Sequence, residues 1–185
     1  MEIKHISTPL TQEKLKDLKS GDSVLISGTM YTGRDAAHAR LVDAINKGEK
    51  LPFDPKDAII YYVGPAPTKP GNVIGSAGPT TSYRMDDLTV PLLELGLTGM
   101  IGKGLRSQTV IDSMKKNGAI YFAAIGGAGA LIANTIKECE IIAFEDLGPE
   151  AVRKLTVVDF PAVVVIDCEG NNLYETERKK YQKID

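Results

Sequence analysis

The sequence predicts an α/β fold with a mixed central sheet, and three observations support this. Short apolar runs that end in glycine or in polar residues alternate with segments of helical periodicity through most of the chain. Apolar residues make up 43% of the sequence and charged residues 25%, as in ordinary globular proteins. A length of 185 residues fits a single domain over 1–185, with 173–185 as a peripheral tail.

The first half of the chain predicts three strands and two helices. The strands are expected at 23–28, 58–64 and 73–74, where branched and aromatic residues gather. One helix is expected to begin with Asp35 as its N-cap and to end at Gly48. A shorter helix is expected after Thr89, because Pro91 is tolerated only in a first turn, and Gly96 would end it.

The second half alternates in the same way. Strands are expected at 98–104, 119–129, 140–146, 154–160 and 162–168, the second of them leading into a loop of small residues. Helices are expected from Ser107 to Lys116, where Asn117 and Gly118 stop the first one, and over 130–139.

Composition argues against several classes of function. The net charge is −2 and the basic residues are spread along the chain, unlike the concentrated positive surface of a nucleic-acid-binding protein. No apolar run reaches membrane-spanning length and the first residues lack the apolar centre of a signal peptide, so we expect a cytoplasmic location. The two cysteines, Cys139 and Cys168, are expected to be free thiols, and they form no zinc or iron–sulfur motif with the two histidines. Any metal chemistry would have to be shared with another chain.

Candidate site residues occur in three segments, each with a strand, a glycine-containing turn and a cation or hydroxyl at the turn. The first carries Arg34, the second carries Thr80, Thr81 and Arg84, and the third carries Lys103. Loops that follow strands in α/β sheets are the usual ligand-binding positions, and helix N-termini there favour anions. Three cations at such positions would suit a small polyanion such as a dicarboxylate.

Each candidate also has a purely structural explanation. A Ser or Thr before a helix most often caps it, and Arg34 beside Asp35 can be a solvated charge. Asp35 and His38 are interpreted as a cap and a first-turn partner rather than as catalysts. Lys103 is the stronger candidate, because glycines on both sides let another group approach the backbone closely.

Two glycine-rich stretches do not match phosphate-binding motifs. In "GMIGKG" the residue after Lys103 is Gly104 instead of Ser or Thr, and Leu97 stands where a P-loop has its first glycine. "GGAGAL" lacks the spacing of a dinucleotide-binding loop, so its small residues are interpreted as allowing close packing or a close approach to a ligand. Nucleotide binding is therefore not expected.

Several segments in order resemble a known family. They are "GTMYTGRDAAHARL", "LPFD", "YYVGPAP", "VIGSAGPTTSYRMD", "LLELGLTGMIGKG" and "YFAAIGGAGAL". Together they resemble the β subunit of class I, iron–sulfur-dependent fumarate hydratase and of L-tartrate dehydratase, which is the C-terminal domain in one-chain members. The resemblance extends from about Ile3 to about Tyr174, and "GPTTS.RMD" followed by "GMIGKG" is its most specific part.

The resemblance implies a swivelling β/β/α domain that docks on an α subunit. That partner would hold a four-iron, four-sulfur cluster, and this chain would hold no metal. By the same resemblance Arg34, Thr81, Arg84 and Lys103 bind a small dicarboxylate substrate, and Thr80 is the candidate catalytic base. The expected activity is a hydro-lyase reaction in an αβ hetero-oligomer, the reversible hydration of fumarate to L-malate.

Other functions stay open from the sequence. The chain could belong to an L-tartrate dehydratase, since the five residues do not separate the two enzymes. It could also be a stand-alone carboxylate-binding domain without catalysis, or a structural subunit whose Arg and Lys residues form salt bridges at an interface.

Overall fold

The structure is a computed structural model that describes residues 2–124 and 127–181. Its strands are β1 (Ile3–Ser7), β2 (Ser23–Thr32), β3 (Ile59–Tyr61), β4 (Gly99–Gly102), β5 (Ile120–Ala123), β6 (Ile136–Ala143) and β7 (Val152–Ile166). Its α-helices are α1 (Gln12–Leu15), α2 (Asp35–Lys47), α3 (Asp86–Glu94), α4 (Gln108–Asn117), α5 (Gly129–Thr135) and α6 (Leu173–Tyr181), and the 3₁₀ helices are η1 (Ser82–Met85) and η2 (Glu145–Glu150).

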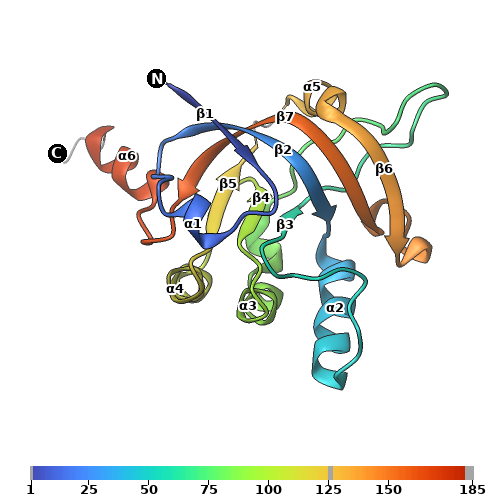
Figure 1. The fold of residues 1–185 in the computed structure, drawn as a ribbon, viewed down its shortest axis with the longest axis horizontal. Helices are drawn as coiled ribbons and strands as arrows, with labels where there is room; N and C mark the ends of the chain where they lie inside the picture. Colours follow the sequence, from blue (N-terminus) through green and yellow to red (C-terminus); the bar gives the residue numbers. More distant parts are fainter. Residues whose placement is uncertain (1, 125–126, 182–185) are drawn as a thin grey trace.

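The strands form one mixed sheet that closes into a small barrel (Figure 1). Within the described residues the order is β1-β2-β3-β4-β5-β7-β6, and an additional pairing joins β2 to β7. Strands β2 to β5 run parallel, whereas β7 is antiparallel to both β2 and β5. The five strands β2, β3, β4, β5 and β7 therefore make a closed ring, and the sequence prediction of an α/β fold with a mixed sheet is confirmed.

The length of β7 explains the closure. One edge of β7 pairs with β2 from Lys154 to Val163, while the other edge meets β6 in its first half and β5 in its second half. The sequence prediction of two strands here is wrong, because the chain continues through a bulge. Asp159 takes a positive φ of 53° and the register against β2 shifts beside it, so the strand bends without ending.

Alternate side chains of the barrel strands enter two separate cores. Tyr61 of β3 belongs to the cluster that also contains Phe122 of β5 and Leu155 of β7. Its neighbours Ile60 and Tyr62 belong to the second cluster, shared with helices α2, α3 and α4. This period of two is expected for strands buried on both faces, and Figure 1 shows the three helices together on one side of the barrel.

Helix boundaries differ from the sequence predictions in three places. Helix α3 begins at Asp86, so Thr89 lies inside it, where its hydroxyl donates to the Met85 carbonyl. Helix α2 has Arg34 at the N-cap position, and Asp35 is its first residue. Residues 136–139 belong to strand β6 instead of a helix, and residues 73–74 form no strand.

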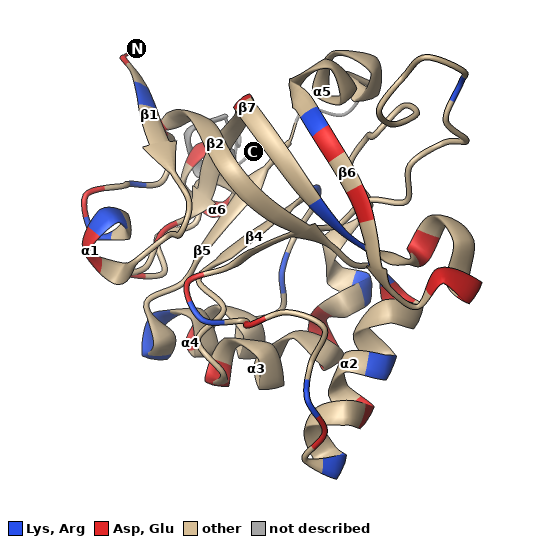
Figure 2. Cartoon of the chain, turned by 45° about the vertical axis from the view of Figure 1, so that its right-hand side comes forward, with Lys and Arg blue, Asp and Glu red and all other residues tan. Residues whose placement is uncertain are grey.

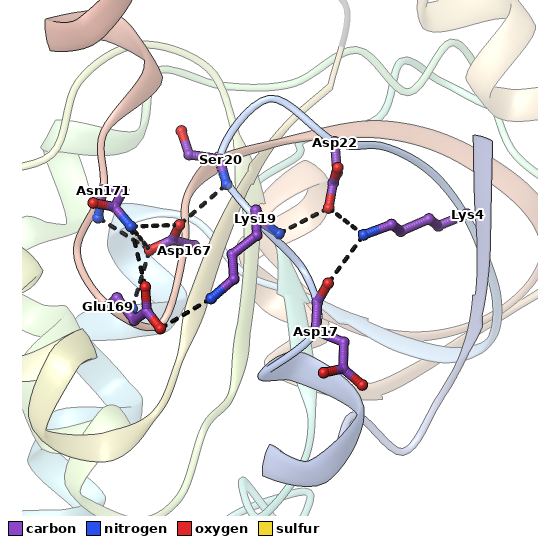
Figure 3. Close-up of polar contacts among 8 residues, drawn as sticks. All are labelled: Lys4, Asp17, Lys19, Ser20, Asp22, Asp167, Glu169 and Asn171. Atoms are coloured by element: carbon purple, nitrogen blue, oxygen red, sulfur yellow. Dashed lines mark hydrogen bonds and ion pairs between the residues drawn. The ribbon is translucent and has the colours of Figure 1, made fainter. Parts of the chain in front are cut away.

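A polar cluster joins the turn before β2 to the turn after β7 (Figure 3). The carboxylate of Asp167 accepts hydrogen bonds from the backbone N–H groups of Ser20, Glu169 and Asn171. Lys19 adds an ion pair of 2.9 Å to Glu169. This Asp167 cluster lies at the amino-terminal end of β2, so it holds the barrel together at the end opposite to the loops that follow the parallel strands.

Charged residues of both signs are interspersed over the strands and helices (Figure 2). Strand β6, for example, carries Lys137 beside Glu138 and Glu140. Among residues 2–124 and 127–181, no helix combines the length and the apolar composition needed to cross a bilayer.

Candidate functional site

The predicted site residues lie just beyond the carboxyl ends of the parallel strands. Arg34 follows β2 by two residues and Lys103 directly follows β4. Between them runs the segment 79–85, which pairs with the chain beyond β3 through a Val63–Pro79 bridge. Carboxyl ends of adjacent parallel strands meet at one edge of a sheet, so residues far apart in sequence are collected there.

Backbone hydrogen bonds fix the two threonines beside Lys103. Thr80 donates its N–H to the Tyr62 carbonyl at 2.7 Å, and Lys103 donates its N–H to the Thr80 carbonyl at 3.2 Å. The Ser82 N–H in turn donates to the Lys103 carbonyl at 2.8 Å. In the described part of the chain, the Lys103 ammonium and the hydroxyls of Thr80 and Thr81 have no hydrogen-bond or ion-pair partner, and Lys103 is exposed.

Gly102 makes this close packing possible. A Cβ atom at Gly102 would overlap the Ser82 hydroxyl oxygen and would lie 2.9 Å from Cδ2 of Tyr62. The sequence interpretation of this glycine, as a position that another group approaches closely, is confirmed. The group that approaches belongs to η1 of the same chain.

Two carboxylates of the chain hold the predicted arginines. Asp35 Oδ2 lies 3.0 Å from Arg84 Nη2 and 3.7 Å from Arg34 Nη2. Glu150 Oε1 lies 3.4 Å from the same Arg34 nitrogen. Arg34 also runs across the backbone of Gly64, where a Cβ atom would be 2.7 Å from its Nη1.

Asp35 therefore does not have the capping role predicted for it. No side chain of the N-cap residue bonds to the first turn of α2, and the Ala36 N–H donates instead to Glu150 Oε2 at 2.9 Å. The carboxylate of Asp35 faces the arginines, where its Oδ2 is buried and makes ion contacts without a well-aligned hydrogen bond. Sequence analysis missed Glu150. One of its carboxylate oxygens accepts the Ala36 N–H at the start of α2, and the other contacts Arg34.

The three cations are consequently not equivalent. Arg34 and Arg84 are opposed by Asp35 and Glu150, so three positive charges minus two negative charges leave one. The Arg34 side chain is 22% exposed and the Arg84 side chain is 46% exposed, so an incoming anion can still reach the Arg84 guanidinium. Lys103 is the cation with the greatest freedom to bind an added carboxylate.

A buried ion pair near the site was also missed. Arg106 donates through Nε to Asp86 Oδ1 at 2.6 Å, through Nη1 to the Tyr62 hydroxyl at 3.1 Å and through Nη2 to the Thr89 hydroxyl at 2.9 Å. Burial lowers the pKa of Arg106, but Tyr62 and Asp86 raise it more strongly, so the net pKa lies above the ordinary value. Asp86 belongs to the "RMD" segment that carries the family resemblance, and no sequence pattern marks Arg106.

His38 has the structural place predicted for it in the first turn of α2. It is fully buried, and its Nδ1 lies 3.0 Å from the Arg34 carbonyl. A carbonyl oxygen only accepts, so Nδ1 carries the proton, and Nε2 is left as a buried acceptor with no partner among the described residues. Burial lowers the pKa of His38 to about 4, which keeps the ring neutral near pH 7.

Comparison with known proteins assigns the family. Residues 2–177 match the family model described as fumarase C-terminus. This chain belongs to the fumarase C-terminus family. It is 40% identical over 182 residues to a Methanocaldococcus jannaschii protein whose name provisionally assigns it as L(+)-tartrate dehydratase subunit beta, with 95% of this chain and 93% of that protein covered.

Other relatives are longer proteins. The chain is 45% identical over 153 residues to "Fumarate hydratase class I, anaerobic" of Escherichia coli, which covers 81% of this chain and 28% of that protein. It is 42% identical over 166 residues to "Fumarate hydratase 2" of Leishmania major, with coverages of 88% and 29%. The chain thus spans less than a third of these fumarate hydratases but nearly the whole of the tartrate dehydratase subunit.

The described side chains of this fumarase C-terminus family member do not fit an iron–sulfur cluster. The described residues contain no group of three or more His, Cys, Asp or Glu side chains placed to hold a metal ion. Cys139 and Cys168 are free, and burial is the main cause that raises the pKa of each thiol. Cluster ligation requires thiolates, which a raised pKa disfavours.

None of the five predicted site residues lines the cavity between the loop 66–76 and the segment 130–137, which has a volume of about 550 Å³. These five residues are Arg34, Thr80, Thr81, Arg84 and Lys103. The candidate site lies apart from this cavity, at the strand ends, where the charged side chains of Arg84 and Lys103 are exposed.

Proposed function

We propose that this chain is the β subunit of a class I hydro-lyase, with fumarate hydratase as the first candidate and L-tartrate dehydratase as the second. The observation that carries the proposal is the arrangement of Lys103 beside Thr80 and Thr81, in a member of the fumarase C-terminus family. Backbone hydrogen bonds hold these three residues together, whereas their side-chain polar groups have no partner in the described residues.

Charge explains how the site would act. In the dehydration of malate, a proton leaves a carbon next to a carboxylate and negative charge develops there, while the hydroxyl leaves the adjacent carbon and water is the product. An iron–sulfur cluster of the partner would supply a Lewis acid for the departing hydroxyl. Lys103 and the accessible Arg84 would bind the carboxylates and stabilise that charge through charge-assisted hydrogen bonds. Because Asp35 and Glu150 already oppose the charges of Arg84 and Arg34, a substrate carboxylate would have to compete with these two carboxylates for the arginine N–H groups.

Thr80 is proposed as the catalytic base, and Thr81 as a hydrogen-bond donor to a substrate carboxylate. A threonine hydroxyl is ordinarily far too weak an acid to ionise at neutral pH, so Thr80 could act only if cations stabilise its alkoxide and water is excluded. The neighbouring Lys103 supplies the cation. A second chain over this open surface would supply the exclusion of water.

That second chain is proposed to be an α subunit. The Methanocaldococcus jannaschii relative is named as a beta subunit, and this chain spans less than a third of two fumarate hydratases. We place the four-iron, four-sulfur cluster in the partner, because the described residues here do not fit it. The swivelling β/β/α domain and the cytoplasmic location remain predictions from the sequence.

Substitution of Lys103 tests the proposal. Lys103→Met removes the charge and keeps an unbranched stem, so the complex with the α subunit should still assemble. If Lys103 binds a substrate carboxylate, kcat/KM should fall about 10- to 150-fold, which is roughly 1.5–3 kcal/mol of transition-state binding. Assays should use anaerobic complex with fumarate, L-malate and both tartrate enantiomers, which also separates the two candidate reactions.

Lys50→Met is the matched control, because Lys50 is exposed beyond the C-terminal end of α2, whereas Arg34 lies at the N-terminal end of that helix. It should leave kcat/KM within about twofold. If Lys103→Met blocks assembly but the complex that still forms turns over normally, Lys103 forms a contact at the subunit interface and does not bind substrate. That result would support the structural-subunit alternative. Tight dicarboxylate binding by the lone chain, with no turnover in any complex, would support a carboxylate-binding domain.

A further inference from the structure

The buried ion pair of Arg106 and Asp86 lies between the two segments that carry the candidate site. The Arg106 side chain is 0% exposed and the Asp86 side chain is 8% exposed. Arg106 follows Lys103 by three residues, and Asp86 follows Arg84 by two. The pair therefore joins the turn after β4 to the junction of η1 with α3.

All three nitrogens of the Arg106 guanidinium donate hydrogen bonds. The oxygen partners are Asp86, the Tyr62 hydroxyl and the Thr89 hydroxyl, and Nη1 also lies 3.5 Å from the Met100 sulfur. The other oxygen of Asp86 accepts the backbone N–H of Ser107 at 2.5 Å, so Asp86 holds the same turn at two points. An ammonium group on a lysine has no planar fork and cannot reproduce this set of directions.

A second buried contact joins the same two segments. The Tyr121 hydroxyl lies 2.9 Å from the Ser82 hydroxyl and donates to the Gly104 carbonyl at 2.9 Å. Ser82 follows Thr81, and Gly104 follows Lys103. The Tyr121 contacts therefore add to the backbone hydrogen bonds that fix the position of Lys103 relative to Thr80 and Thr81.

Burial of an ion pair is weak evidence for a role in stability. Removing two charges from water is costly, and well-packed apolar residues often replace such a pair without loss of stability. A geometric role explains the placement better, because catalytic groups displaced by about 1 Å can lose roughly 10²-fold in rate.

We propose that Arg106 and Asp86 are positioning residues, which set Lys103 against Thr80, Thr81 and Arg84 without touching the substrate. This inference rests on the proposed function for its catalytic consequence, but its structural part can be tested without any activity. The positioning acts on both substrate binding and turnover, because Lys103 is proposed to hold a carboxylate in the ground state and in the transition state.

The catalytic test uses Arg106→Lys in the assembled αβ complex. The charge is kept and the fork is lost, so KM for the dicarboxylate should rise and kcat should fall, together lowering kcat/KM by roughly 10- to 100-fold. A purely structural role would lower the active fraction and so the apparent kcat, but KM would stay the same. That second result would overturn the proposal.

Arg40→Lys is the matched control. Arg40 also makes a two-point ion pair, at 2.8 Å and 2.6 Å to Asp146, but its side chain is 43% exposed. The same chemical change there should leave both kinetic constants within about twofold. An equal effect of the two substitutions would also overturn the proposal.

The structural test measures hydrogen exchange in the chain without a partner. Arg106→Lys should speed exchange of the Lys103 and Ser82 amides at least about tenfold, while the amides of β2 and β7 change little. A uniform change, or none at these two amides, would contradict positioning. If no complex shows hydro-lyase activity, the proposed function fails, and this measurement alone decides the structural part.

Tyr62→Phe is a second, milder variant for the case in which Arg106→Lys does not fold. It removes one acceptor of the Arg106 fork and leaves the buried ring in place. Exchange at Lys103 and Ser82 should rise by a smaller factor, with a KM increase of roughly 2- to 5-fold. Unchanged exchange and unchanged KM in this variant would overturn the proposal.

Discussion

At the scale of single residues, Thr80 and Thr81 separate proton transfer from substrate binding. Thr80→Val keeps the branched shape and removes the hydroxyl, so kcat should fall roughly 10²–10⁴-fold if Thr80 is the base. Thr81→Val should raise KM more than it lowers kcat, because a hydrogen bond to a carboxylate exists in the ground state too. The deciding measurement is exchange of the malate proton with solvent. Exchange at the wild-type rate in Thr80→Val would assign the abstraction to another group.

His38 predicts a pH dependence of stability. Its pKa is about 4 in the folded chain and about 6.5 when unfolded, so the unfolded state binds more protons between these values. The stability present above pH 6.5 is lost as the pH falls towards 4, and about 2 kcal/mol of it should be gone at pH 5. Urea unfolding at pH 7 and pH 5 measures this loss.

His38→Gln is the comparison for that experiment, because its amide can still donate to the Arg34 carbonyl but does not titrate. The free energy of unfolding of this variant should fall less between pH 7 and pH 5 than that of the wild type. Identical falls in the two proteins would show that His38 does not titrate with the low pKa.

At the scale of elements, periodicity predicted most strands and helices because their burial repeats every two or every three to four residues. Helix α4, with Ser107 as a cap and Gly118 in the left-handed region, lies almost where the sequence placed it. The failures occur where tertiary contacts override local signals. Two strands were predicted over 154–160 and 162–168, yet β7 continues as one strand because pairing with β2 on one edge holds both halves. Residues 136–139 form a strand because β7 offers them an edge.

The Asp167 cluster predicts where stability depends on one element junction. Asp167 is 1% exposed and accepts three backbone N–H groups, so Asp167→Ala should lower the free energy of unfolding by about 2–3 kcal/mol. Glu169→Ala removes the ion pair between Glu169 and Lys19. Because the Glu169 side chain is 62% exposed, this variant should lower the free energy of unfolding by less than about 1 kcal/mol. Urea denaturation compares them. Equal losses would mean that the buried carboxylate is not what holds this junction.

At the scale of the whole molecule, the sequence predicts that the candidate residues share one edge of the sheet, but it does not predict how their charges balance. Strand ends and glycine turns indicated Arg34, Arg84 and Lys103 as neighbours, because parallel strands deliver their following loops to one edge. The neutralising role of Glu150 depends on η2 returning to the start of α2, a long-range contact with no local pattern. The same holds for Arg106, whose oxygen partners lie 17 to 44 positions away.

The incompleteness of the site gives the prediction for the whole assembly. This chain made alone should be colourless and inactive, because the described residues do not fit an iron–sulfur cluster and the candidate site is an open, charged surface. Addition of a cluster-loaded α subunit under anaerobic conditions should restore hydro-lyase activity. Exposure to oxygen should then abolish the activity while leaving this chain folded, which circular dichroism can check. If the lone chain turns over fumarate or tartrate at full rate and resists both chelators and oxygen, the two-subunit assignment is wrong. The chemistry would then have to come from Thr80, Lys103 and the arginine pair alone.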